Sequence, residues 1–121
     1  MLIRRLKECP QIVAGDQTRL RELLHPGRGY DFDGRYSLAH AALAPGMTST
    51  PHRLISTEVY YILSGTGEMH IDSESATVEP GDAVTIPIEA VQWIKNIGST
   101  PLEFLCIVDP AWRAEDEEIL E

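Results

Sequence analysis

The stretch from Pro45 to Gly67, PGMTSTPHRLISTEVYYILSGTG, decides the fold of this chain. Five residues separate Gly46 from His52, five more separate His52 from Glu58, and six separate Glu58 from Gly65. The residues from Glu58 to Leu63 are rich in β-formers, and glycine-containing turns stand on both sides of the stretch. We therefore predict strands that carry a histidine and a carboxylate into the same interior.

A second segment, Gly81 to Asn96 (GDAVTIPIEAVQWIKN), completes the pattern. The first stretch resembles the first cupin motif, and this segment resembles the second one, with Gly81, Pro87 and Asn96 at the motif positions. The resemblance covers the chain from about Tyr36 to Val108. It implies a double-stranded β-helix, a small jelly-roll barrel that holds its ligand pocket between two sheets.

Three residues depart from the cupin pattern. Leu54 stands where the family places its second histidine, Glu89 where it places the glycine of motif two, and Gln92 where it places the last histidine. If the motif glycine needs a positive φ, a glutamate there costs on the order of 1 kcal/mol. We therefore expect the turn after Pro87 to have changed shape.

The rest of the chain also has the periodicity of an all-β protein, with short apolar or alternating runs separated by Gly and Pro. We expect one domain over residues 1–121, with a barrel core at about 36–108 and the segments 1–35 and 109–121 packed on it. Thr18 to Leu24 is read as a strand in preference to a short helix, and the tail after Pro110 as a helical turn or a surface segment. The other expected strands are Leu2–Leu6, Tyr36–Leu43, Glu58–Leu63, Gly67–Asp72, Ser75–Val78, Ala83–Ile86, Gln92–Asn96 and Leu102–Val108.

Composition excludes several classes of function. Ten Lys and Arg residues against nineteen Asp and Glu residues give a formal net charge of −9, which opposes contacts with nucleic-acid phosphates. No apolar run approaches the length of a membrane span, so we expect a cytoplasmic protein with no membrane partner. Cys9 and Cys106 lie far apart without a CxxC spacing, and two separate buried thiols are the expected state.

Strand alternation predicts which side chains meet inside the barrel. If His52 points inward, Leu54 does too, and Val59, Tyr61 and Leu63 take the outer face. Trp93 and Lys95 also point outward. The predicted pocket holds His52, Glu58 and Gln92 around a common centre, walled by Leu54, Tyr60, Ile62 and Ile94.

The resemblance implies a metal site at His52, Glu58 and Gln92, with Fe, Mn, Ni or Zn as the candidate divalent metals. The alternative is a pocket without metal, in which His52 and Glu58 form a hydrogen-bonded pair. His40 is expected to be solvent-facing or hydrogen-bonded on its strand, or else to turn into the ligand position that Leu54 leaves empty. His70 is expected to face away from the core.

Three functions follow as alternatives. The first is an isomerase, lyase or oxygenase for a small carbonyl or sugar-like substrate, with His52 and Glu58 as ligands or acid and base and Tyr60 as proton donor. The second is a module that binds a small organic ligand without turnover. The third is a structural or regulatory barrel. The resemblance also implies a homodimer, to which the N-terminal strand would contribute.

Overall fold

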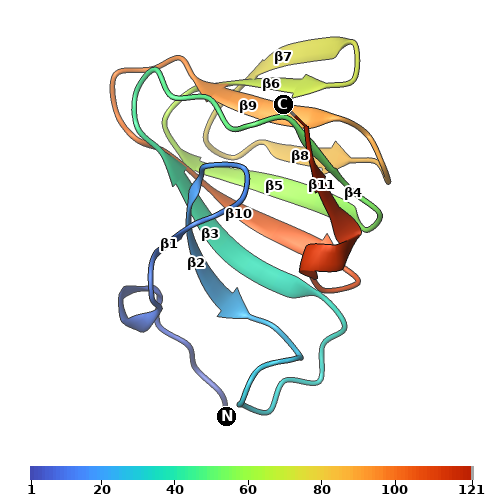
Figure 1. Ribbon diagram of the computed structural model, residues 1–121. Coiled ribbons are helices and arrows are strands. Elements are labelled where there is room, and N and C mark those ends of the chain that lie inside the picture. Colours follow the sequence, from blue (N-terminus) through green and yellow to red (C-terminus); the bar gives the residue numbers. More distant parts are fainter. Residues whose placement is uncertain (121) are drawn as a thin grey trace.

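A computed structural model describes residues 1–120 and shows an almost entirely β protein (Figure 1). Two short 3₁₀ helices, η1 (Leu6–Glu8) and η2 (Ala114–Asp116), lie near the two ends of the chain. The strands are β1 (Ile12–Val13), β2 (Arg19–Leu24), β3 (Ser37–Leu43), β4 (His52–Leu54), β5 (Thr57–Ser64), β6 (Gly67–Ile71), β7 (Glu74–Val78), β8 (Ala83–Ile86), β9 (Gln92–Asn96), β10 (Leu102–Asp109) and β11 (Glu117–Ile119).

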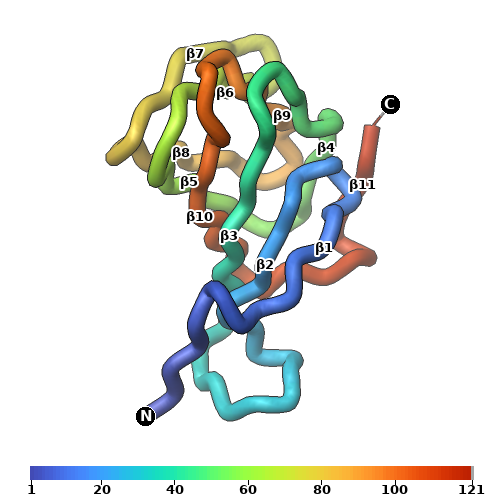
Figure 2. Tube along the Cα trace, turned by 90° about the vertical axis from the view of Figure 1, so that its left-hand side faces the viewer, coloured from blue at the N-terminus to red at the C-terminus, as the bar shows by residue number. Residues whose placement is uncertain are grey.

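The strands form two antiparallel sheets that face each other. One sheet has the order β1-β2-β3-β10-β5-β8, and the other has the order β11-β4-β9-β6-β7. Figure 2 shows the sheets curving around a common interior, with β1 and β2 to one side of the barrel. The predicted all-β jelly-roll barrel is confirmed.

The alternation of β5 and β10 positions the core. On β10 the residues Leu102, Phe104, Cys106 and Val108 are buried, while their neighbours are partly exposed. On β5, Glu58, Tyr60 and Ile62 are buried, and Tyr61 and Leu63 are exposed. Gln92 and Ile94 are likewise buried on β9, with Lys95 exposed. The predicted inward register is therefore correct on both sheets.

The N-terminal prediction is wrong. Leu2–Leu6 forms no strand, and η1 begins at its last residue. The short strands β1 and β11 were not expected, because segments of two or three residues are too short to show a period of two. The strand expected to carry His52 is β4, for which no bounds were predicted. The strand reading of Thr18 to Leu24 is confirmed by β2, and the helical turn in the tail is confirmed by η2.

The turn after Pro87 contains a positive φ at Glu89. Glu89 has a φ of 62°, so it adopts the left-handed conformation although it is not a glycine. Its N–H donates to the carbonyl of Leu54 at 2.7 Å, and the N–H of Ala90 donates to the carbonyl of Pro87 at 3.2 Å. These two bonds hold the backbone in the positive-φ conformation at the cost of some strain. The turn after Pro87 therefore has a positive φ at a residue that carries a side chain, and whether its shape differs from that in other cupins stays a prediction.

Gly65, by contrast, is a residue that this fold requires. Its φ is 84°, and a Cβ at this position would lie 2.7 Å from the carbonyl oxygen of Pro101. The close approach of the β5–β6 turn to the start of β10 therefore needs a residue without a side chain. Among the described residues, no helix is long and apolar enough to span a membrane.

Candidate functional site

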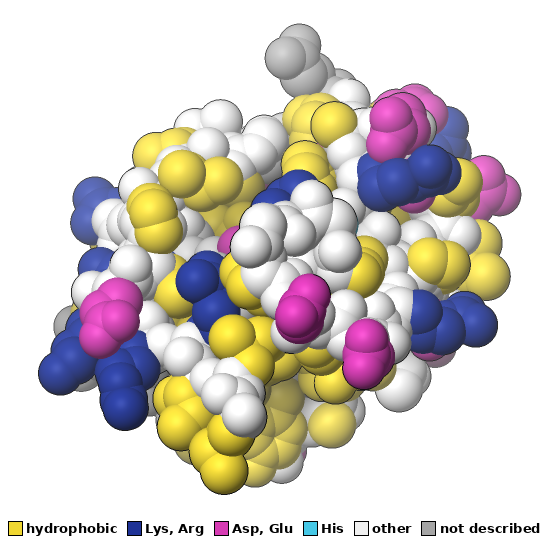
Figure 3. All heavy atoms as spheres, turned by 90° about the horizontal axis from the view of Figure 1, so that it is seen from below, with side chains coloured by type: hydrophobic (Ala, Val, Ile, Leu, Met, Phe, Trp, Pro, Cys, Tyr) yellow, Lys and Arg dark blue, Asp and Glu magenta, His cyan; other side chains and the backbone are white. Residues whose placement is uncertain are grey.

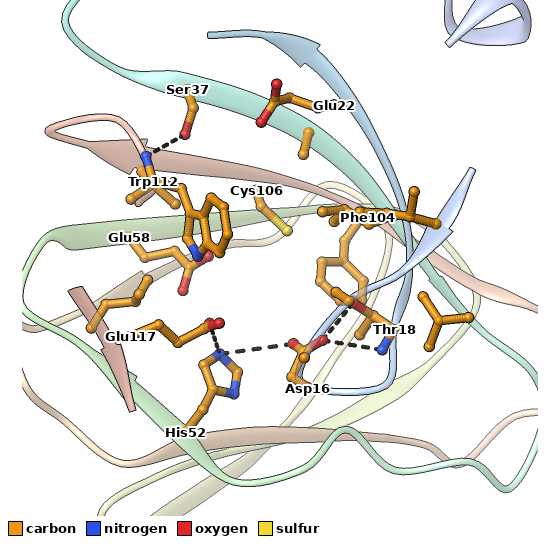
Figure 4. Close-up of a pocket in the computed structure, with 18 of the residues that line it drawn as sticks. Asp16, Thr18, Glu22, Ser37, His52, Glu58, Phe104, Cys106, Trp112 and Glu117 are labelled. Atoms are coloured by element: carbon orange, nitrogen blue, oxygen red, sulfur yellow. Dashed lines mark hydrogen bonds and ion pairs between the residues drawn. The ribbon is translucent and has the colours of Figure 1, made fainter. Parts of the chain in front are cut away.

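A cavity of about 550 Å³ opens between the two sheets. This volume lies within the usual range for small-molecule sites, about 300–1,000 Å³. The wall is largely apolar and aromatic, and the polar side chains within it come from six strands, from the N-terminal segment and from three loops (Figure 4). The strands are β2, β3, β4, β5, β10 and β11, and the loops precede β2, follow β2 and follow β10. The polar or titratable residues on the wall are Arg4, Asp16, Thr18, Glu22, Arg28, Tyr30, Ser37, His52, Glu58, Tyr60, Cys106, Trp112 and Glu117.

His52 begins β4 and has only 2% of its surface exposed. Its Nδ1 lies 2.9 Å from the carbonyl oxygen of Thr50. Because a carbonyl oxygen only accepts, Nδ1 carries the hydrogen and donates it. Nε2 faces the carboxylates of Asp16, at 3.8 Å, and Glu117, at 4.0 Å. The imidazole is thus fixed in orientation, with Nε2 at the cavity, where it can accept or hold a proton.

The two carboxylates beside His52 come from segments far from it in sequence. Asp16 is anchored by Thr18, whose backbone N–H and hydroxyl donate to Oδ1 at 3.1 and 2.7 Å. Glu117 is positioned because β11 pairs with β4, with Glu117 opposite Leu54. Burial and then the charge of Asp16 raise the pKa of Glu117, while the charge of His52 and a hydrogen bond from Trp112 lower it.

Glu58 has a different partner. The side-chain amide of Gln92 donates from Nε2 to Oε1 of Glu58 at 2.8 Å, and this bond joins β9 to β5 across the interior. Burial raises the pKa of Glu58 from its ordinary value of 4.5 to about 8, and the charges of Asp16 and Glu117 add to this, against the hydrogen bond from Gln92. Glu58 is therefore largely a neutral carboxylic acid at pH 7.

Tyr60 and Cys106 lie on the same wall as Glu58. Burial raises the pKa of both groups well above their ordinary values, and the charge of Glu58 adds to the effect. Both are therefore protonated near neutral pH, and Tyr60 can act as a hydrogen-bond donor. The Tyr60 ring packs on Phe104 with a centroid separation of 4.5 Å. Cys9 and Cys106 are free thiols, which confirms the expectation that they are not paired.

The structure brings only part of the predicted site together. His52, Leu54, Glu58 and Tyr60 line the cavity. Ile62 and Ile94 lie in the hydrophobic core, and Gln92 reaches Glu58 without reaching the cavity wall. No hydrogen bond joins His52 to Glu58 in the part of the chain that the structure describes. Sequence reasoning missed Asp16, Glu117 and Trp112, because all three lie outside the two motif segments.

The other histidines have partners outside the cavity. His40 lies 3.1 Å from Glu103, so it does not turn toward Leu54, and its reading as a bonded strand histidine is confirmed. His70 stacks on Trp93 at 3.5 Å between ring centroids and approaches Glu68 at 2.7 Å. His25 lies at the start of a turn, where it accepts a hydrogen bond from the N–H of Gly27 and contacts the carbonyl of Trp112.

The family can now be stated, because the barrel, its inward register and its motif residues agree with a family model. The Cupin_2 model, described as a cupin domain, matches residues 39–108. The chain is a cupin. Its match begins within β3 and ends within β10, so Asp16 and Glu117 lie outside the part of this cupin that the model covers.

Known relatives agree with this assignment. The cupin is 40% identical to the uncharacterized protein MJ1618 of Methanocaldococcus jannaschii, over 90% of this chain and 86% of that protein. Its fold resembles a predicted oxalate decarboxylase from Thermotoga maritima, with a TM-score of 0.77, 23% identity, and coverage of 88% and 97% of the two chains. It also resembles a Streptomyces nucleoside dehydratase solved with uridine, with a TM-score of 0.78, 18% identity, and coverage of 100% and 92%.

The cupin fold implies a metal, and the donor set here fits one poorly. Leu54 offers no donor, Glu58 is largely protonated at neutral pH, and the amide of Gln92 is directed at Glu58. Among residues 1–120, no group of three or more His, Cys, Asp or Glu side chains is arranged to hold a metal ion. No chemical step is therefore assigned to a metal, and the predicted ligand set of His52, Glu58 and Gln92 stays a prediction.

Proposed function

We propose that this cupin binds a small hydroxyl- or carbonyl-bearing organic molecule and catalyses proton transfer on it, as a lyase or an isomerase. The orientation of His52 supports this most directly. Thr50 fixes the protonated Nδ1, so Nε2 is presented to the cavity as a base, and the flanking carboxylates stabilise the imidazolium that forms when it takes a proton.

Glu58 would act as the acid. A carboxyl group that keeps its proton near neutral pH can protonate a leaving hydroxyl or a carbonyl oxygen. In an elimination from a β-hydroxy carbonyl compound, His52 takes the proton from the carbon next to the carbonyl, a C=C bond forms, and the C–O bond breaks. Glu58 gives its proton to the departing hydroxyl, which leaves as water. Tyr60 donates a hydrogen bond to the carbonyl oxygen.

Two enzymes among the proteins of similar fold support a catalytic function. A nucleoside dehydratase and a polyketide cyclase share the barrel, and an oxalate-binding protein from Thermotoga maritima is 32% identical over 58% of this chain. The alternative is a module that binds its ligand without turnover, which the largely apolar wall and Leu54 favour.

The test is deuterium exchange. A panel of β-hydroxy carbonyl and keto compounds is incubated with the protein in D₂O, and proton NMR follows exchange next to the carbonyl and the appearance of alkene signals. We expect exchange with wild type, loss of it in His52→Gln, and retention in His70→Gln, a matched change outside the cavity. Binding of the panel without exchange would instead support the alternative.

We also propose a homodimer and a cytoplasmic location. Two free cysteines support a reducing compartment. Tyr61 and Leu63, on the outer face of β5, are 41% and 42% exposed, and Leu2 and Ile3 are 44% and 60% exposed. A second copy that covers the outer face of the six-stranded sheet would bury such side chains.

A further inference from the structure

Arg4 lies on the cavity wall although it belongs to the extended N-terminal segment. Its Nε donates to the carbonyl of Leu23 at 3.0 Å, and its guanidinium lies 4.3 Å from the centre of the Tyr30 ring. The Tyr30 hydroxyl in turn accepts from the N–H of His25 at 2.9 Å. The guanidinium is thus held by a backbone acceptor and an aromatic ring, and not merely by solvent.

Arg4 differs from the other arginine on the wall. Arg28 forms a bidentate pair with Glu22, from Nε at 2.6 Å and Nη2 at 3.0 Å, so its charge is compensated. Arg4 has no carboxylate within 4.0 Å in residues 1–120. Its polar contacts within residues 1–120 are to Leu23 and, more weakly, to the thiol of Cys9, and they involve Nε and Nη2 but not Nη1.

Charge is therefore unevenly distributed in the cavity. Asp16 and Glu117 surround His52, whereas both guanidiniums come from the N-terminal segment and the loop after β2. The face shown in Figure 3 has both basic and acidic side chains beside hydrophobic ones, in a chain whose net charge is −9. An anionic ligand group would be repelled beside Asp16 and Glu117 and attracted to Arg4.

We propose that Arg4 binds a carboxylate or phosphate group at one end of the ligand, whose other end lies against His52. The planar guanidinium matches either oxyanion, and the stacking on Tyr30 reduces the entropy lost on binding. The proposal rests on the proposed function for the position of the reacting end. It narrows the ligand class to small organic acids or phosphate esters that carry a hydroxyl or carbonyl group.

Calorimetric titration of the full chain with three small compounds that share a phenyl ring tests the proposal. Benzyl alcohol is neutral, phenylacetate carries a carboxylate, and phenyl phosphate carries a phosphate. The variants are Arg4→Gln, Arg4→Lys and Arg5→Gln. Arg5 is the matched control, because it is exposed, lies beside Arg4 in sequence, pairs with Glu8 and does not line the cavity.

We expect wild type to bind one or both anions more tightly than benzyl alcohol. Arg4→Gln should weaken that binding about tenfold, Arg4→Lys less, and Arg5→Gln not measurably, with benzyl alcohol unaffected throughout. The anion whose affinity falls more in Arg4→Gln shows whether Arg4 binds a carboxylate or a phosphate. An equal loss in Arg5→Gln, or anions that bind no better than benzyl alcohol, would overturn the proposal. Binding through Arg4 without deuterium exchange would overturn the proposed catalysis and leave this site standing.

Discussion

Glu58 is the residue at which burial changes chemistry most directly. Its carboxyl group is enclosed, and Asp16 and Glu117 place two further carboxylates in the same cavity. Each of these effects disfavours the ionised form, and the single hydrogen bond from Gln92 does not offset them. The same acids that lie beside His52 therefore add to the effect of burial in keeping Glu58 neutral.

This state of Glu58 predicts how stability depends on pH. The folded protein keeps the Glu58 proton up to about pH 8, whereas the unfolded chain loses it near pH 4.5. Between these values the folded state binds more protons, so the contribution of Glu58 to stability is present below pH 4.5 and is lost as pH rises to 8. Glutamine does not titrate, so Glu58→Gln should not lose this contribution. We therefore expect the unfolding free energy of Glu58→Gln, compared with that of wild type, to increase by a few kcal/mol as the pH rises from 5 to 8. Urea denaturation at several pH values measures it.

The control for this prediction is Glu79→Gln, which changes an exposed carboxyl in the turn after β7. Its unfolding free energy should follow that of wild type at every pH. If the curves of wild type and Glu58→Gln run parallel from pH 5 to 8, Glu58 is ionised in the folded protein, and its role as the acid fails.

Leu54 and Gln92 stand where the cupin pattern has histidines, and restoring both histidines should create a metal site. Leu54 is buried on the cavity wall, and Gln92 is buried opposite His52 in the β4–β9 pairing. Leu54→His together with Gln92→His should supply two imidazoles beside His52. We expect Ni(II) or Zn(II) at a hundred times its dissociation constant to stabilise the double variant by about 2.7 kcal/mol in thermal unfolding.

Wild type under the same conditions tests the predicted set of His52, Glu58 and Gln92. A shift in wild type that disappears in Glu58→Ala would restore the metal prediction. A double variant that shows no shift with either metal would count against the inward register of Leu54 and Gln92.

At the scale of elements, the motif strands could be predicted and the elements that complete the site could not. Glu58, Tyr60 and Ile62 show the period of two that places them inside, and burial agrees. Asp16 sits in a loop, and Glu117 sits on a three-residue strand whose neighbours are also acidic. No local sequence pattern predicts that the C-terminal segment pairs with β4, because the paired residues lie about sixty positions apart in the sequence. Both carboxylates beside His52 were therefore found only in the structure.

The β8–β9 turn carries a prediction about backbone strain. A left-handed conformation costs a residue with a side chain about 1–2 kcal/mol, and glycine avoids this while losing about 0.5–1 kcal/mol through its freer unfolded state. Glu89→Gly should therefore be neutral or slightly stabilising. Glu79→Gly, at an exposed position without a positive φ, should be destabilising. We expect the two variants to differ by about 1 kcal/mol in urea denaturation, and equal losses in both would contradict the strain at Glu89.

For the whole molecule, the two faces of the six-stranded sheet have different environments. The inner face lines the core and the cavity, whereas the outer face of β5 presents Tyr61 and Leu63 beside β10. A net charge of −9 separates copies by repulsion at long range, so association requires enough buried apolar surface to offset it. Added salt screens that repulsion and should therefore tighten the proposed dimer.

The proposed dimer predicts different effects for two matched surface changes. Leu63→Asp places a charge on the outer face of β5, while Ile97→Asp changes a residue of similar exposure, 44% against 42%, in the turn between β9 and β10. An unpaired buried carboxylate costs several kcal/mol, so Leu63→Asp should shift the protein to monomers, and Ile97→Asp should stay dimeric. Sedimentation equilibrium over a range of concentrations and salt measures both. If the wild-type protein remains monomeric at high salt, the outer face of the six-stranded sheet is not a dimer interface.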